Sequence, residues 1–281
     1  MRRKIVAALA AVTAAFGLAF TAAPAQASTG GTADGDTHAG VAIIVNYTPE
    51  GRFRCSAVLI SPTVLLTAGH CTAGVVGRTL VSFDSFIAEK NPPSPFPSAA
   101  DPSVGYTSAD LAGRISGTTF TDPDFANAPA KNIPNDVGVV VLDQPVDQPT
   151  YPLAALGTLD LAPGDIPKTT VTAVGYGAEL AKPASGPQRR VPVSYPLFRR
   201  SVDLRLQQVE SDYFVTHANV NPGADTGGVC SGDSGGPVFL NGAIVGLVSF
   251  GKPDCLALDG MQRVDIPSIQ NWLSTFLNPT P

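Results

Sequence analysis

The sequence has little charge, few histidines and few long hydrophobic runs. Charged side chains make up 15% of the 281 residues and hydrophobic ones 44%. This composition excludes a disordered chain, which combines high charge with low hydrophobicity. The net charge of −5 argues against a nucleic-acid-binding protein, which presents a basic face. The 28 glycines and 26 prolines indicate many turns, and they argue against helical bundles and coiled coils.

The N-terminus carries the one notable hydrophobic run. Residues 5–20 are apolar and follow the basic residues 2–4, but the run is short for a membrane span. Residues 25–27 then show the small-x-small pattern of a signal-peptidase site. We therefore predict that residues 1–27 are a cleaved secretory signal and that the mature protein is extracellular and not membrane-bound. Removing three basic residues takes the net charge from −5 to −8.

Cysteine and histidine are both scarce. Four cysteines in a secreted protein indicate two disulfides. Metal ligation is the alternative, but no Cys-x-x-Cys pair occurs and the only histidines are His38, His70 and His217. We predict neither a metal nor a cofactor.

Short strand-like runs separated by turns dominate the pattern, which favours paired barrels or a sandwich. A helix is predicted only near the C-terminus, where Pro267 suits a first turn and apolar residues follow at helical spacing. The proline-rich residues 91–110 are predicted to be an exposed insertion, and residues 145–152 to be the boundary between two units. The predicted strands are 41–45, 55–60, 64–67, 137–142, 170–174, 238–240 and 244–250.

Residues 232–236, Gly-Asp-Ser-Gly-Gly, place the hydroxyl of Ser234 among glycines. Glycines allow a sharp turn and close approach of a substrate, and successive backbone N–H groups in such a turn converge on an anion. A serine nucleophile also needs a base. His70 ends a buried-looking strand, whereas His38 and His217 lie in polar stretches. Asp136 opens a buried apolar run, where a carboxylate needs a partner such as a histidine N–H.

The order of His70, Asp136 and Ser234 along the chain argues against two other kinds of acyl-transfer enzyme. Residues 232–236 also fit the Gly-x-Ser-x-Gly turn of α/β-hydrolases, but those enzymes place the histidine after the serine. No histidine follows His217 here, and the subtilisin order begins with aspartate. A secreted esterase or lipase is therefore disfavoured, although an ester-cleaving side activity is expected.

Three motifs carry a family resemblance: TAGHC at 67–71, DVGVVVL at 136–142 and CSGDSGGP at 230–237. In this order they resemble the catalytic segments of the chymotrypsin/trypsin-like serine peptidases. The resemblance implies an all-β fold of two six-stranded antiparallel barrels with a C-terminal helix. Residues 28–150 would form the first barrel, and residues 151–281 the second barrel and the helix.

The resemblance also implies a role for each catalytic residue. Ser234 would be the nucleophile, His70 the general base and Asp136 the group that orients His70. The N–H groups of Gly232 and Ser234 would form the oxyanion hole. The implied disulfides are Cys55–Cys71 and Cys230–Cys255, and the implied strand that pairs with substrate is Ser249, Phe250 and Gly251.

The implied function is that of a secreted, monomeric serine endopeptidase that cleaves proteins or peptides. The alternative is a catalytically silent homologue that serves as a secreted binding module, which the unusual N-terminus favours. Members of the family begin with Ile or Val, and the freed amine pairs with the aspartate before the nucleophile, here Asp233. The aligned residue in this chain is Ser28, directly after the predicted cleavage site. We predict that the Ser28 amine pairs with Asp233; otherwise an arginine does so, which the sequence does not identify.

The floor of the specificity pocket is a second departure. Trypsins carry aspartate six residues before the nucleophile, where this chain has Gly228, followed by Val229. This predicts a preference for apolar P1 residues over Arg and Lys. In an ungapped alignment Asp259 falls at a pocket-wall position, which would restore a basic preference, whereas one gap places Gly260 there. A solvated loop position is the interpretation that we favour for Asp259. Surface exposure is likewise the favoured interpretation for the arginine pairs at 189–190 and 199–200.

Overall fold

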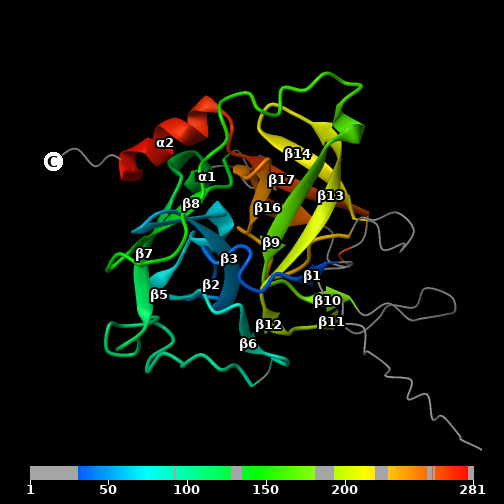
Figure 1. Cartoon of the computed structure of the whole chain (residues 1–281). Helices are drawn as coiled ribbons and strands as arrows, with labels where there is room; N and C mark the ends of the chain where they lie inside the picture. Colours follow the sequence, from blue (N-terminus) through cyan, green and yellow to red (C-terminus); the bar gives the residue numbers. More distant parts are fainter. Residues whose placement is uncertain are drawn as a thin grey trace, which may run out of the picture.

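Two antiparallel barrels lie side by side in the computed structural model of the chain (Figure 1). The structure describes residues 31–91, 93–127, 135–180, 193–218, 227–251, 255 and 257–277. The predicted signal at 1–27 and Ser28 lie outside these residues. Among the residues described, no helix is long and apolar enough to cross a bilayer.

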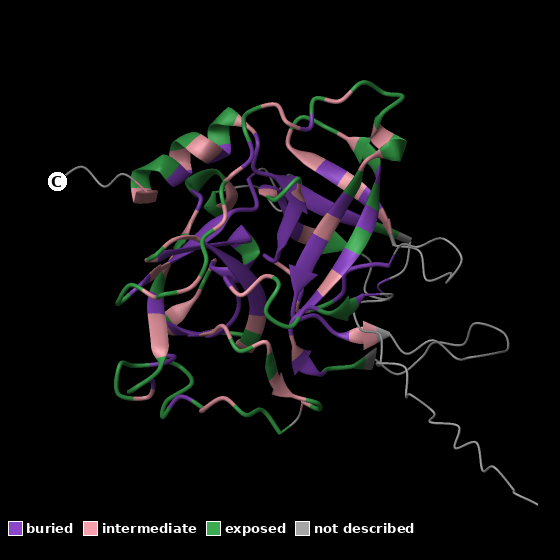
Figure 2. Ribbon diagram, viewed as in Figure 1, coloured by how far each residue is buried: buried purple, intermediate pink, exposed green. Residues whose placement is uncertain are grey.

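The first barrel is closed by six strands in the order β2-β3-β4-β8-β7-β5, and β5 returns to pair with β2. Strands β2, β4 and β8 are almost entirely buried, shown in purple in Figure 2, and are rich in β-branched and leucine residues. The strands are β2 (Val41–Thr48), β3 (Gly51–Ser61), β4 (Val64–Thr67), β5 (Val76–Ser82), β7 (Ile115–Thr121) and β8 (Gly138–Leu142).

The second barrel runs β13-β14-β17-β16-β15-β9, and β9 pairs with β13 to close it. The short strand β1 (Thr32–Ala33) adds to its edge beside β13. The two-barrel fold with a terminal helix is confirmed; the division of the chain at residue 150 stays a prediction. The barrel strands are β9 (Thr170–Gly175), β13 (Arg200–Val209), β14 (Tyr213–Ala218), β15 (Pro237–Leu240), β16 (Ala243–Gly251) and β17 (Ala257–Arg263).

Smaller elements connect the barrels. The helix α2 (Pro267–Leu277) follows the second barrel in sequence but lies beside β8 and α1 (Pro123–Ala126) of the first (Figure 1). Its Ile269 and Leu273 are fully buried, and the Phe276 ring lies 5.4 Å from the Phe120 ring of β7, tilted by 52°. The helix therefore joins the two halves through an apolar face. Two further pairs are β6 (Phe86–Ala88) with β12 (Leu197–Phe198), and β10 (Glu179–Leu180) with β11 (Val193–Ser194).

The segment 91–110 is only in part the exposed insertion that we predict. Its turns are largely exposed, but Tyr106 is fully buried and Ala99 is 6% exposed. The Tyr106 ring packs edge-on against Tyr47 at 5.0 Å, and its hydroxyl donates to the Pro97 carbonyl at 2.6 Å. An aromatic anchor thus ties the proline-rich segment to the first barrel.

The prediction that Arg199 and Arg200 are solvated is wrong, since both are 1% exposed. Arg199 donates from Nε to Asp34 at 3.0 Å and from Nη1 to the carbonyls of Val41 and Phe83. Asp34 is also buried and accepts from His38. Burial would raise the pKa of Asp34, but the hydrogen bonds from His38 and Arg199 outweigh it and lower that pKa. Arg199 therefore fastens the N-terminal segment to both barrels.

Replacing Arg199 with methionine is expected to lower the free energy of unfolding by about 3–5 kcal/mol, because it leaves Asp34 buried without its cation. Urea unfolding measures the loss. Arg205→Ala is the matched control, since Arg205 lies exposed on β13, the strand that directly follows Arg199. Equal midpoints for the two variants would contradict the role of Arg199.

Candidate active site

His70 lies at the junction of the two barrels, in a single 3-10 turn (Gly69–Cys71) directly after β4. The Cys55–Cys71 disulfide ties this turn to β3. Gly69 leaves no room for a side chain there, because a Cβ on it would lie 2.9 Å from the Phe125 ring. The His70 side chain remains 37% exposed. It is thus fixed at its base and open to solvent at its tip.

Asp136 holds His70 through two hydrogen bonds. Oδ1 accepts from the His70 backbone N–H and Oδ2 from His70 Nδ1, both at 2.8 Å. The Ser249 hydroxyl donates to Oδ2 at 2.5 Å. Burial would raise the pKa of Asp136, but these hydrogen bonds outweigh it and lower that pKa. An ionised acceptor at Nδ1 keeps the proton on that nitrogen and leaves Nε2 free to accept one.

A tight turn presents Asp136 to the histidine. Asn135 has a left-handed φ of 54°, a conformation that asparagine tolerates better than most residues. Its carbonyl accepts from the Val137 N–H at 2.6 Å. Gln262 of β17 accepts the Asp136 N–H at 2.8 Å. The second barrel therefore supports the aspartate of the first.

Ser234 lies in the turn that precedes β15 and abuts the His70 segment. Gly235, at φ 75°, approaches so closely that a Cβ on it would lie 2.0 Å from Thr67 Oγ1 and 2.7 Å from the Ala68 nitrogen. The Ser234 carbonyl accepts from the Ser56 N–H at 2.8 Å. The structure thus brings the turn of Ser234 against the strand end that leads to His70. Among the described residues, the Ser234 hydroxyl makes no hydrogen bond with His70, a bond that is often long in a substrate-free site.

Two backbone N–H groups in the nucleophile turn are without a protein acceptor among the described residues. Asp233, Gly235 and Gly236 donate their N–H groups to Cys230, Val248 and Asp233 carbonyls. The N–H groups of Gly232 and Ser234 make no such bond. Gly232 has a φ of 101°, which the turn requires and which only glycine adopts readily. The pair fits the predicted anion site.

A strand edge that has no partner strand among the described residues borders the site. β15 pairs with β16 only as far as Leu247, whereas β17 pairs with β16 out to Phe250 and Gly251 on the other side. Among the described residues, no strand pairs with Ser249, Phe250 and Gly251 on the side that faces away from β17, so this edge stays the predicted place for an extended peptide.

The interpretation of Asp259 as a solvated loop residue is wrong. Asp259 lies in β17 and is 1% exposed. Its Oδ2 accepts from the Val229 N–H at 3.0 Å, and its Oδ1 would lie 3.1 Å from a Cβ on Gly251. Burial raises the pKa of Asp259 to about 7. A carboxyl group therefore stands in the wall of the predicted pocket, beside buried Gly228 and Val229. The Cys230–Cys255 disulfide joins the two segments that bound this wall.

Metal chemistry finds no support in the one candidate cluster of the described residues. Cys55, Cys71 and His70 offer ligand atoms within 4.8 Å of one another. Both cysteines are joined in a disulfide, and a thiolate is the form of cysteine that binds metal.

Comparisons with known proteins agree with this geometry. The sequence profile described as Trypsin matches residues 103–273, more than half of the chain. The chain belongs to the trypsin family of serine peptidases. The matched region contains Asp136 and Ser234, while His70 precedes it.

Relatives within the trypsin family are distant. The chain is 29% identical over 220 residues to a trypsin of Saccharopolyspora erythraea, covering 73% of this chain and 78% of that protein. It is 31% identical over 240 residues to brachyurin of Leptuca pugilator, covering 83% and 91%. The solved structure of HL collagenase superposes with a TM-score of 0.59 at 16% identity, covering 91% of this chain and 98% of that one. That last similarity concerns the fold alone.

Two residues that support the site carry no recognisable sequence signal. Ser56 of β3 donates from its hydroxyl to the Gly232 carbonyl and accepts the Tyr176 N–H, both at 2.9 Å. Gln262 stands behind Asp136. Each is a single polar residue in a strand, and only the packing of the two barrels gives it a partner in the site.

Proposed function

We propose that the protein is a secreted serine endopeptidase in which Ser234, His70 and Asp136 act as a catalytic triad. The observation that carries the proposal is the His70–Asp136 pair set against a glycine turn whose Gly232 and Ser234 N–H groups have no acceptor among the described residues. Membership of the trypsin family supports peptide-bond hydrolysis, and two disulfides support an extracellular location.

Each residue has one step in the proposed mechanism. Ser234 Oγ attacks the scissile carbonyl carbon while His70 Nε2 takes the hydroxyl proton. The oxyanion that forms accepts hydrogen bonds from Gly232 and Ser234. The C–N bond then breaks as His70 passes its proton to the leaving amine, and an ester to Ser234 remains. Water, deprotonated by His70, hydrolyses that ester and restores the serine. Asp136 stays ionised and stabilises the charged imidazole throughout.

Peptide products test this function directly. The secreted protein is incubated with a peptide library, and new N-termini are identified by mass spectrometry. Cleavage by the native chain and not by Ser234→Ala supports the proposal, as does a weaker hydrolysis of activated esters. Ester hydrolysis without any peptide cleavage would favour an esterase. No cleavage of either by a folded chain would favour the alternative, a silent binding module.

The P1 preference is expected to depend on pH through Asp259. Below the pKa of about 7 the carboxyl is neutral, and the pocket should take apolar P1 residues, as Gly228 and Val229 indicate. Above that pKa the carboxylate should favour Arg and Lys, so the ratio of kcat/KM for Arg over Leu substrates should rise about tenfold between pH 6 and 9. Asp259→Asn should flatten this profile. Asp165→Asn, at an exposed carboxyl, should leave it unchanged; an unchanged profile in Asp259→Asn would contradict the assignment.

A further inference from the structure

Asp233 is a buried carboxylate directly beside the nucleophile. It is 2% exposed, and its two oxygens accept N–H groups from Gly177 at 2.7 Å and Cys230 at 2.9 Å. Burial raises its pKa to about 6, against the opposing effect of these N–H groups and of two arginines. A carboxylate removed from water needs a positive charge as well as neutral donors. The identity of that charge decides how the nucleophile turn is held.

Arg200 provides one positive charge from the second barrel. Its side chain is fully buried, its Nη1 donates to the Gly177 carbonyl at 3.2 Å, and its Nη2 pairs with Glu179 at 2.8 Å. Gly177 therefore binds Asp233 through its nitrogen and Arg200 through its oxygen. Arg200 Nε is buried with no hydrogen-bond partner among the described residues.

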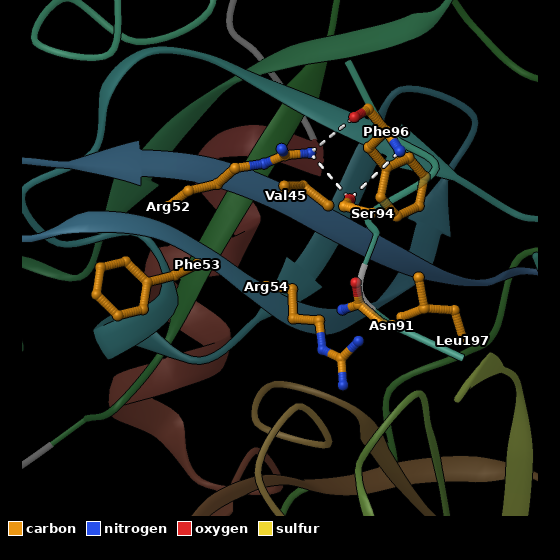
Figure 3. A pocket seen from close by; sticks show the side chains of 8 residues that line it. All are labelled: Val45, Arg52, Phe53, Arg54, Asn91, Ser94, Phe96 and Leu197. Carbon is orange, nitrogen blue, oxygen red and sulfur yellow. Dashed lines mark hydrogen bonds between the residues drawn. The ribbon is translucent and has the colours of Figure 1, made fainter. Parts of the chain in front are cut away.

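Arg54 provides a second positive charge from the first barrel. It lines a pocket of about 180 Å³ together with Arg52. Arg52 bonds to Ser94 and Phe96 there, whereas the Arg54 guanidinium points away from these groups (Figure 3). Arg54 Nε lies 3.3 Å from the Cβ position of Gly232, the residue before Asp233.

Among the described residues, no carboxylate apart from Asp233 is available to pair with the Arg54 guanidinium. Its Nη1 and Nη2 are buried without a hydrogen-bond partner there, and the Tyr195 ring lies 5.5 Å from its Cζ. Burial lowers the pKa of Arg54, and the charge of Asp233 opposes that shift. Two arginines and two carboxylates, Asp233 and Glu179, thus lie in one buried region that spans both barrels, in which Arg200 and Glu179 form the direct ion pair among the described residues.

We propose that Arg54 and Arg200, rather than a freed α-amino group, supply the positive charge that holds Asp233 and so positions the N–H groups of Gly232 and Ser234. Both arginines are positioning residues. The consequence for catalysis rests on the proposed peptidase function; the charge pairing does not. Ser28, the predicted source of an α-amine, lies outside the described residues.

A thermodynamic cycle tests the pairing without any activity. Arg54→Met, Asp233→Asn and the double variant are compared by urea unfolding in the otherwise native chain. Pairing predicts that Arg54→Met lowers the midpoint less in the Asp233→Asn background than in the native one. Equal shifts in the two backgrounds would overturn the proposal, whether or not the protein is a peptidase. Arg54→Lys, which keeps the charge, serves if Arg54→Met does not fold.

Kinetics test the consequence for the oxyanion hole. Arg54→Met should lower kcat about 10- to 100-fold with KM little changed, somewhat less than deletion of an oxyanion donor, and Arg54→Lys should restore much of it. Arg52→Met is the matched control on the same strand and should behave as the native chain. If Arg54→Met raised KM alone, and only for substrates with further residues on the C-terminal side of the scissile bond, the proposal would be overturned. Arg54 would then be a substrate contact.

An N-terminal extension distinguishes the two arginines from the Ser28 amine as the source of the positive charge beside Asp233. A chain with a Gly-Ser extension before Ser28 should retain the kcat of a chain that begins at Ser28. Loss of activity on extension, together with full activity in Arg54→Met and Arg200→Met, would overturn the proposal in favour of the Ser28 amine. A chain inactive in every form contradicts the proposed function, and the unfolding cycle still decides the charge pairing.

Discussion

Ser234→Ala is expected to lower kcat for peptide hydrolysis by about 10⁴- to 10⁶-fold, a range taken from serine peptidases rather than from this geometry. The variant keeps the glycine turn and the two N–H groups but has no atom to form the ester. KM should change little, because the strand edge at Ser249 to Gly251 and the pocket remain. Steady-state kinetics on one peptide substrate measure both quantities.

Ser231→Ala is the matched control for this change. Ser231 is an exposed serine in the same turn, three residues before Ser234. Its hydroxyl has no part in the proposed chemistry, so kcat should equal that of the native chain. If both variants kept native activity, the nucleophile would lie elsewhere.

Asp136→Asn is expected to lower kcat on the order of 10⁴-fold near neutral pH, again a magnitude known for this family's triad rather than worked out from the distances. The carboxylate now accepts from His70 Nδ1 at 2.8 Å and holds the proton on that nitrogen. An amide whose oxygen accepts the His70 backbone N–H, as Oδ1 now does, presents its NH₂ group to Nδ1, which favours the tautomer with the proton on Nε2. That tautomer cannot take the Ser234 proton.

The control for Asp136→Asn is another buried carboxyl of the first barrel. Asp122 is 2% exposed and accepts the Asp124 N–H at the start of α1, a capping role. Asp122→Asn should affect stability and leave kcat unchanged. Fluorophosphonate labelling at high pH should recover in part for Asp136→Asn. Native rates of peptide hydrolysis in Asp136→Asn would show that Asp136 has no part in the mechanism.

The sequence predicts the barrel strands whose side chains are apolar and misses those that bury polar groups. The runs that become β2, β4, β8 and β16 are rich in Val, Ile and Leu and are confirmed as strands. β17 contains Asp259, Gln262 and Arg263, all buried, so no apolar pattern marks it. β13 alternates buried and exposed residues through Val202, Leu204 and Leu206, and this alternation is a period-two signal of a strand.

The site residues also divide into those that the sequence predicts and those that it misses. Glycine turns and short motifs are the signals that predict Ser234, His70 and Asp136 as site residues. The burial of Asp259, Arg199 and Arg200 follows from contacts between segments more than 20 residues apart, such as Arg199 with Asp34 and Asp259 with Val229. A charged side chain is usually exposed, so composition alone predicts the opposite of what the fold does at these three positions.

The most direct test of the proposed triad is the intact mass of the secreted protein before and after treatment with a fluorophosphonate. We expect one adduct per chain, located at Ser234 by peptide mapping and absent in Ser234→Ala. Such an adduct requires both an activated hydroxyl and an assembled oxyanion hole. A folded chain that forms no adduct, or that forms it at another serine, would contradict the proposed triad.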